Sequence, residues 1–184
     1  MILYGAVIAA LLFLAFAFFA VAQAGTVRNG GQSAADAAAL GAAQDDRDEL
    51  FEDFLDKLVA GEDLEDLLDG LGSLAGDGCG EADHFAGRNR SDVLSCDQVT
   101  RNGHHGYKVK VRTRFDTGDT IVPGADDKKA EATATAVIKP RCELKGDDEK
   151  LIEIECDGED FTLDPDDIDL ELRPSDLFSV VLVG

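Results

Sequence analysis

Residues 2–23 read ILYGAVIAALLFLAFAFFAVAQ, an apolar run without a single charged side chain. The first charge in the chain belongs to Arg28. A hydrocarbon core of about 30 Å is crossed by roughly 20 helical residues, and a helix satisfies its own backbone hydrogen bonds in lipid. The run therefore predicts a transmembrane anchor over residues 1–24, with membrane lipid in contact with residues 2–23.

Two interpretations of this run stay open. Ala22-Gln23-Ala24 before Gly25 resembles the small-residue site at which a secretory signal peptide is cleaved. A signal peptide, however, has a positive n-region and an apolar core of about 7–15 residues. Residues 1–5 carry no charge and the apolar core is longer, which favours a permanent single-pass anchor. No Lys or Arg precedes the run, so the positive-inside rule does not orient it.

The rest of the chain is acidic and long enough for one domain with a modest core. Across 184 residues, 38 Asp and Glu stand against 17 Lys and Arg, a net charge of −21. Such a charge argues against binding to nucleic acid, which depends on cationic contacts to phosphate, and against adhesion to anionic lipid headgroups. We interpret the acidity as a soluble, self-repelling surface.

The cysteines indicate the compartment of the domain. There are four, Cys79, Cys96, Cys142 and Cys156, and no CxxC pair of zinc-site spacing. An even count after an export-type segment favours two disulfides in an oxidising compartment. Three connectivities exist, of which we favour the sequence-local one, Cys79–Cys96 with Cys142–Cys156. The alternative, four reduced buried thiols, requires a domain that faces the cytoplasm.

Residues 25–75 predict membrane-proximal helices. Glycines at 25, 30 and 31 weaken a helix by about 1 kcal/mol each, so we expect one long helix with a weak point near Gly30. An acidic amphipathic segment follows from Asp45 and ends at Gly61, and leucines at 64–71 mark a second short helix. A further turn or two of helix is expected over residues 81–89.

Small side chains recur at i, i+4 and i+8 along the tract from Gln32 to Gln44. They would let another backbone approach closely, either a sheet of the same chain or a neighbouring subunit. We assign an assembly contact to Ala35, Ala38, Ala39 and Ala42. The alternative is plain helix propensity in a stalk next to the membrane.

Residues 76–184 read as a β-rich region that packs with residues 25–75 as one domain. Asn102-Gly103 is a strong hairpin signal between strands expected at 92–100 and 107–115. Further strands are expected at 131–139, at 150–156 as the fourth, and at 178–183 as an edge. The predicted fold is α+β, in which a long N-terminal transmembrane helix continues into helices on one face of an antiparallel sheet of about four to five strands.

The strand at 107–115 alternates between apolar and basic side chains. Its basic ladder comprises Lys108, Lys110, Arg112 and Arg114. Because the chain is acidic overall, we expect Glu153 and Glu155 as cross-strand partners of this ladder. The functional alternative is an anion-binding stripe.

Few residues of the sequence suggest catalysis or metal binding. The three histidines, His84, His104 and His105, have no Cys or acidic cluster at ligand spacing, and no nucleophile-elbow, zinc-protease or nucleotide-loop motif occurs. The acidic stretch 157–169 fails the EF-hand pattern, because Thr162 stands at the sixth position where glycine is required; weak calcium binding there stays open. We therefore expect no enzyme, and no catalytic, cofactor or metal site.

One tract carries a family resemblance. Gln32-Ser-Ala-Ala-Asp-Ala-Ala-Ala-Leu40, directly after the apolar run, resembles the N-terminal module of TadE/TadG-like Flp (tight adherence) pilus-assembly proteins. A loose likeness continues through a helix near residues 85–89 and alternating strands that end in Ala132-Thr-Ala-Thr-Ala-Val137. The chain is thus similar to a compact, pilin-like TadG relative, which implies a pilus or secretion apparatus and a domain outside the cytoplasmic membrane.

The chain also departs from that family. Prepilin-like members carry a Gly followed by a Glu at the fifth mature position, whereas Gly5 is followed by Ala-Val-Ile-Ala-Ala. Larger TadG proteins carry a von Willebrand-type domain with a metal site, for which this chain is too short. We therefore expect neither prepilin-peptidase processing nor polymerisation of the chain alone.

Together these features predict a non-enzymatic, single-pass protein of the cell membrane whose extracytoplasmic domain acts as a minor pilin-like subunit. Its expected partners are other pilus-assembly proteins. The alternative is a secreted acidic binding protein, released by cleavage after Ala24.

Overall fold

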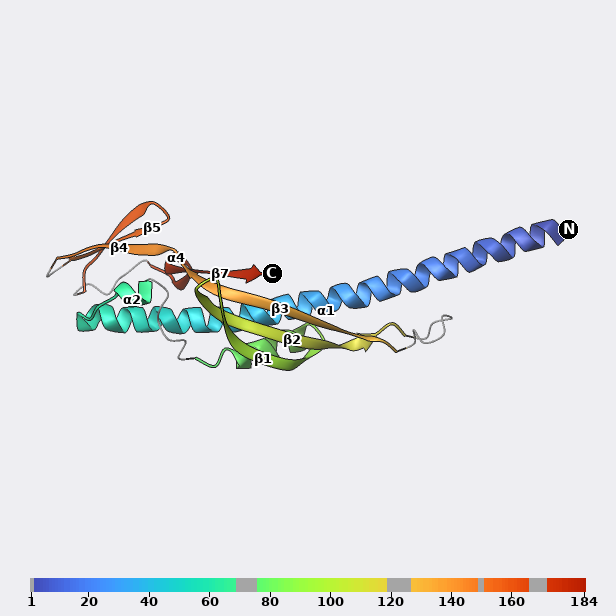
Figure 1. The fold of residues 1–184 in the computed structure, drawn as a ribbon, viewed down its shortest axis with the longest axis horizontal. Helices are drawn as coiled ribbons and strands as arrows, with labels where there is room; N and C mark the ends of the chain where they lie inside the picture. Colours follow the sequence, from blue (N-terminus) through green and yellow to red (C-terminus); the bar gives the residue numbers. More distant parts are fainter. Residues whose placement is uncertain (1, 69–75, 119–126, 149–150, 166–171) are drawn as a thin grey trace.

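A computed structural model describes residues 2–68, 76–118, 127–148, 151–165 and 172–184. The chain is α+β, as the sequence predicts. A long N-terminal helix runs past a four-stranded antiparallel sheet, and a second, three-stranded sheet lies beside the far end of that helix (Figure 1). The expected leucine at 71 of the second short helix lies outside the described residues.

The first helix, α1 (Ile2–Ala60), is continuous over 59 residues, which corresponds to roughly 90 Å at 1.5 Å per residue. It does not break at the expected weak point. A Cβ at Gly30 would lie 2.6 Å from Cζ of Phe115, so this glycine allows the helix and the sheet to approach closely. The helix ends where Gly61 adopts a φ of +66°, a conformation that glycine reaches without steric cost.

Within the described residues, three short helices accompany α1. They are α2 (Glu65–Leu68), α3 (Cys79–Arg88) and α4 (Pro174–Leu177). The α3 helix packs against α1 and β1, and α4 leads directly into the last strand. The helices expected at 64–71 and 81–89 are therefore present, with α3 beginning two residues earlier than expected.

The main sheet has the strand order β1-β2-β3-β7, and all its pairs are antiparallel. Its strands are β1 (Ser91–Arg101), β2 (His104–Asp116), β3 (Lys129–Pro140) and β7 (Phe178–Val183). Asn102 and Gly103 form the predicted turn, with φ of +53° and +83°. Tyr107, Val109 and Val111 are fully buried on the face that α1 covers, and the intervening basic residues lie on the opposite face.

A second sheet corrects the prediction of a single one. It has the order β4-β5-β6, from β4 (Cys142–Asp148), β5 (Leu151–Cys156) and β6 (Glu159–Leu163). The segment expected as the fourth strand is β5, which pairs with β4 and β6 and not with a described strand of the main sheet. Cys142 lies opposite Cys156 in the β4–β5 pair. The chain therefore folds back on itself after Pro140 instead of extending the main sheet.

One continuous core links α1 to both sheets. Between α1 and the main sheet it consists of small side chains, because alanines of α1 meet alanines of β3. Toward the small sheet it contains larger groups, including Phe54, Leu68, Ile154 and Leu163, each at most 2% exposed.

Candidate functional site

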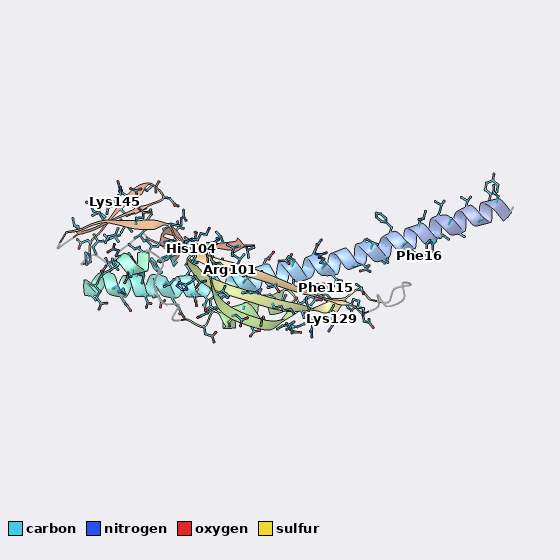
Figure 2. The ribbon with its side chains drawn as sticks, in the orientation of Figure 1. Phe16, Arg101, His104, Phe115, Lys129 and Lys145 are labelled. Atoms are coloured by element: carbon cyan, nitrogen blue, oxygen red, sulfur yellow. A yellow bond between two sulfur atoms is a disulfide. The ribbon has the colours of Figure 1, made fainter. Side chains whose placement is uncertain are left out.

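The N-terminal part of α1 is the largest exposed apolar surface of the described residues. Its most apolar 18-residue window has a mean hydropathy of 2.7 and no residue of that window is buried by the rest of the protein. Phe13 is 68% exposed and Phe18 81% exposed, and Phe16 projects from the helix away from any other element (Figure 2). A soluble protein rarely exposes so large an apolar surface. The helix is long and apolar enough to cross a membrane, in agreement with the predicted single-pass arrangement.

The alanine tract lies inside the protein, which corrects the predicted assembly contact. Ala35, Ala38, Ala39 and Ala42 all have no exposed surface. They belong to the core shared with the main sheet and α3. A side chain without exposed surface does not reach a second protein unless the fold opens. The alanine tract therefore packs closely against the chain's own main sheet and α3, and not against a neighbouring subunit.

Both disulfides are closed. Cys79 is bonded to Cys96 and Cys142 to Cys156, the sequence-local pairing. The first joins the start of α3 to β1, and the second joins β4 to β5. No free cysteine is left in the chain, so these residues offer no nucleophile.

The basic ladder of β2 has partners other than the expected ones. Lys110 and Arg112 both reach Glu131 on β3, at 2.7 and 2.5 Å, and Arg114 pairs with Asp92 on β1 at 2.7 Å. The expected partner Glu155 instead pairs with Lys145 in the small sheet, because β5 does not belong to the main sheet; Glu153 lies on the same strand. Three of the four basic groups thus form ion pairs, two of them with the same carboxylate, which weakens the anion-stripe alternative.

Charge compensation is strongest at Glu131. Hydrogen bonds from Lys110 and Arg112 lower the pKa of the Glu131 carboxyl to about 2. The carboxylate therefore stays ionised at any physiological pH and pairs with both basic groups on the outer face of the sheet.

A buried polar centre between α1 and β2 was missed at the level of sequence. The Tyr107 hydroxyl donates to Oδ2 of Asp46 at 2.8 Å and accepts from the backbone N–H of Gly78 and the amide of Gln98, at 3.2 and 3.1 Å. Burial raises the pKa of Tyr107 to about 12. Burial also raises the pKa of Asp46, although the hydrogen bond from Tyr107 acts in the opposite direction.

Asp46 is 1% exposed, and its second oxygen, Oδ1, has no hydrogen-bond partner among the described residues. Four further carboxylates surround this region, and we call the five residues together the acidic centre. They are Asp45, Asp46 and Glu49 of α1, Asp77 in the entry to α3, and Glu81 in the first turn of α3. A sequence signal was present, since Asp46 stands among alanines and leucines on the buried side of α1.

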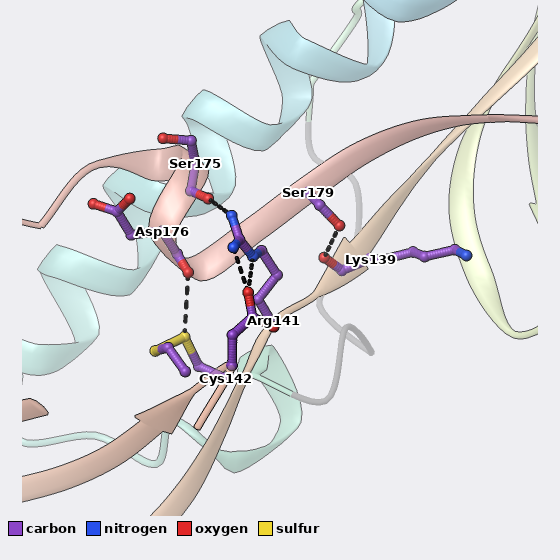
Figure 3. Close-up of polar contacts among 8 residues, drawn as sticks. Lys139, Arg141, Cys142, Ser175, Asp176 and Ser179 are labelled. Atoms are coloured by element: carbon purple, nitrogen blue, oxygen red, sulfur yellow. Dashed lines mark hydrogen bonds and ion pairs between the residues drawn. A yellow bond between two sulfur atoms is a disulfide. The ribbon is translucent and has the colours of Figure 1, made fainter. Parts of the chain in front are cut away.

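A hollow of about 360 Å³ lies at the junction of the two sheets and is lined by Arg141, Glu143, Glu155 and Asp157 among others. Figure 3 shows how Arg141 is held there. Its Nη1 donates to the Ser175 carbonyl at 2.7 Å, and its Nε donates to Oδ2 of Asp157 at 2.7 Å. The guanidinium therefore joins the β3–β4 connection to α4 and to the β5–β6 turn, and we interpret the hollow as structural.

The histidines do not gather. His104 and His105 lie half-buried at the start of β2, directly after the turn, and Nδ1 of His105 lies 3.3 Å from the Thr100 hydroxyl. Within the described ranges, no three His, Cys, Asp or Glu side chains are arranged around a metal position. The acidic stretch 157–169 contributes β6 and an ion pair between Asp157 and Arg141, and its residues 166–169 lie outside the described part.

Comparison of the chain with known proteins identified no relative. The chain matches no family model, no curated protein and no solved structure.

Proposed function

We propose that this protein is a non-enzymatic, membrane-anchored assembly component, a minor pilin-like subunit, of a Tad/Flp-type pilus or secretion apparatus. The observation that carries the proposal is that α1 is one continuous helix with two different parts. Its apolar N-terminal part is exposed, and its C-terminal part is buried beneath an antiparallel sheet. A helix of this kind ties the position of the domain rigidly to the membrane.

The disulfides support a place outside the cytoplasmic membrane. Two bonds close all four cysteines, and structural disulfides persist in oxidising compartments. The proposed orientation therefore places the N-terminal end of α1 at the cytoplasmic face and the two sheets on the extracytoplasmic side of the cell membrane.

The tract that resembles TadE/TadG-like proteins packs internally, so the contact with partners must lie elsewhere. The span offers one exposed surface for such a contact, since residues 3–16 are all exposed. Helices in lipid associate where small residues let backbones approach, and Gly5 and Ala9 have this small-xxx-small spacing. The span carries no charged group that would fix the register of identical copies, and the net charge of −21 makes identical domains repel one another. A minor subunit among other assembly proteins fits this better than a homopolymer.

The test is co-purification of the full chain from detergent-solubilised native membranes, followed by identification of the bound proteins. We expect other pilus-assembly proteins to be recovered. The matched control replaces residues 2–23 with an unrelated apolar span of equal length, which should keep the membrane location and lose the partners. Recovery of the chain alone, or of filaments made only of this chain, would contradict the proposal.

A further inference from the structure

Several cations without an acidic partner gather at the end of the main sheet that lies nearest the apolar span, residues 2–23. We call them the membrane-side cations, and they are Arg28, Arg90, Lys128 and Lys129. All four side chains are exposed, and no described carboxylate forms an ion pair with any of them. The guanidinium carbon of Arg90 lies 5.3 Å from the ring centroid of Phe115. Figure 2 shows Phe115 and Lys129 at this end of the sheet, and Arg101 and His104 at the opposite end.

Two contacts show that β2 runs along α1 toward the span. The Tyr107 hydroxyl meets Asp46, and a Cβ at Gly30 would meet the ring of Phe115. The path from Asp46 to Gly30 along α1 is about 24 Å at 1.5 Å per residue. The path from Tyr107 to Phe115 along β2 is about 26 Å at roughly 3.3 Å per residue. Because the two lengths agree, β2 lies nearly parallel to α1, and each residue after Phe115 lies closer to the membrane.

This geometry places the membrane-side cations at the depth of the lipid headgroups, which extend about 5–8 Å beyond the hydrocarbon core. Arg28 lies about 8 Å beyond Gln23, the last residue of the span, at 1.5 Å per residue. Lys129 pairs with the residue after Phe115, and Lys128 lies opposite the next one. The two lysines therefore lie about 7 and 4 Å beyond the level of Gln23.

The excess of negative charge lies elsewhere in the chain. Residues 45–66, at the far end of α1 and directly after it, contain eleven Asp and Glu and two Lys and Arg. Near the span the charges are balanced, because Asp92 pairs with Arg114 and the sequence between β2 and β3 adds Asp119 and Asp126. Lys and Arg extend along apolar stems and reach farther than the short Asp side chain. The argument from net charge against adhesion to anionic headgroups therefore does not apply to this end of the domain.

We propose that the membrane-side cations bind the phosphate groups of anionic phospholipids where α1 leaves the bilayer. The N–H groups of Lys and Arg form charge-assisted hydrogen bonds with phosphate oxygens, and a negative membrane surface attracts basic side chains next to a span. The contact gives the domain a second attachment to the membrane besides α1. It rests on α1 crossing the membrane, and not on the orientation of α1 or on partners in a pilus.

Thermal unfolding of the full chain tests the contact in micelles of a neutral maltoside detergent that contain phosphatidylcholine or phosphatidylglycerol. We expect phosphatidylglycerol to give a Tm about 3–8 °C higher, as followed by circular dichroism. NaCl at 1 M, where the Debye length is about 3 Å, should remove most of this difference. No other protein of the proposed apparatus is present, so the result is independent of the proposed function.

Two triple variants with equal change of charge locate the contact. Arg28→Gln with Lys128→Gln and Lys129→Gln should abolish the difference between the lipids, and Arg90 is kept because it contacts Phe115. The matched control removes three other cations that lack a described acidic partner, farther from the span along the sheet. It combines Arg101→Gln, Lys108→Gln and Lys139→Gln, and it should retain the difference.

Acetylation of lysines in the wild-type chain is a second measurement that needs no variant. With a neutral reagent and detection by mass spectrometry, Lys128 and Lys129 should react several-fold more slowly in phosphatidylglycerol than in phosphatidylcholine, while Lys108 and Lys139 react equally in both. The proposal is overturned by equal Tm values in the two lipids, by a difference that 1 M NaCl leaves unchanged, or by equal acetylation of Lys128 and Lys129. It is also overturned if the membrane-side variant keeps the difference or the control variant loses it.

Discussion

At the scale of single residues, Tyr107 joins α1, β2 and the entry to α3. Its hydroxyl contacts Asp46, Gly78 and Gln98 at 2.8 to 3.2 Å. The residues in the closest of these contacts are 61 positions apart in sequence. The sequence predicts that Tyr107 is buried, because it starts an alternating strand, but no local pattern predicts that an acid of α1 will lie opposite its hydroxyl.

Tyr107→Phe should therefore destabilise the domain by roughly 1–3 kcal/mol, the cost of leaving buried groups unpaired. Chemical unfolding monitored by circular dichroism measures the change. The chain offers a matched control, since its other tyrosine, Tyr4, is 77% exposed on the bare part of α1. Tyr4→Phe should leave the unfolding free energy unchanged. Equal behaviour of the two variants would show that the Tyr107 hydroxyl contributes nothing.

The lowered pKa of Glu131 predicts how the stability of the domain changes with pH. Its pKa is lowered from 4.5 to about 2 by Lys110 and Arg112. A carboxyl whose pKa is lower in the folded state contributes stability above the unfolded pKa, and this stability is lost as the pH falls from about 4.5 toward 2. Carboxyl ¹³C NMR of the folded chain should show a Glu131 midpoint near 2, and Arg112→Ala should raise it. A midpoint near 4.5 in the wild-type chain would show that the ion pairs do not form in solution.

At the scale of elements, much of the fold follows from local patterns. The β1–β2 hairpin was predicted from Asn102-Gly103 and from the alternation of β2, and the end of α1 from Gly61. The small sheet was not predicted as a sheet, because β4 contains Gly146 at a register irregularity and lacks regular alternation. Asp157-Gly158, with φ of +49° and +89°, is an Asp-Gly hairpin signal that would have predicted β6.

The alanine tract shows a second limit of prediction from the sequence. The spacing of the alanines indicates that another backbone approaches α1 closely. Whether that backbone belongs to the chain's own sheet or to another subunit depends on tertiary contacts, which the spacing does not reveal. Ala38→Leu should cost roughly 1–3 kcal/mol through overpacking, since Ala38 has no exposed surface. Ser33→Leu, at an exposed position of the same helix, is the control and should have little effect. An unchanged Tm in Ala38→Leu would mean that α1 does not pack on the sheet as described.

At the scale of the whole molecule, α1 connects an exposed apolar surface, which suits contact with lipid, to a core of small side chains. The apolar part is bare through residue 16, and Val27, 5% exposed, is the first residue buried by the domain. Residues 22–25, which contain the candidate cleavage site, lie within the unbroken helix. Proteolytic cleavage favours exposed loops over regular helix, so we expect the anchor to be permanent.

The most direct test of this account is N-terminal sequencing of the cell-associated protein after alkaline carbonate washing of membranes. We predict that the chain stays in the membrane fraction and retains the residues that precede Gly25, because an apolar helix of this length is extracted only by detergent. A soluble form that begins at Gly25 would contradict the anchored assembly component and establish the secreted binding protein in its place.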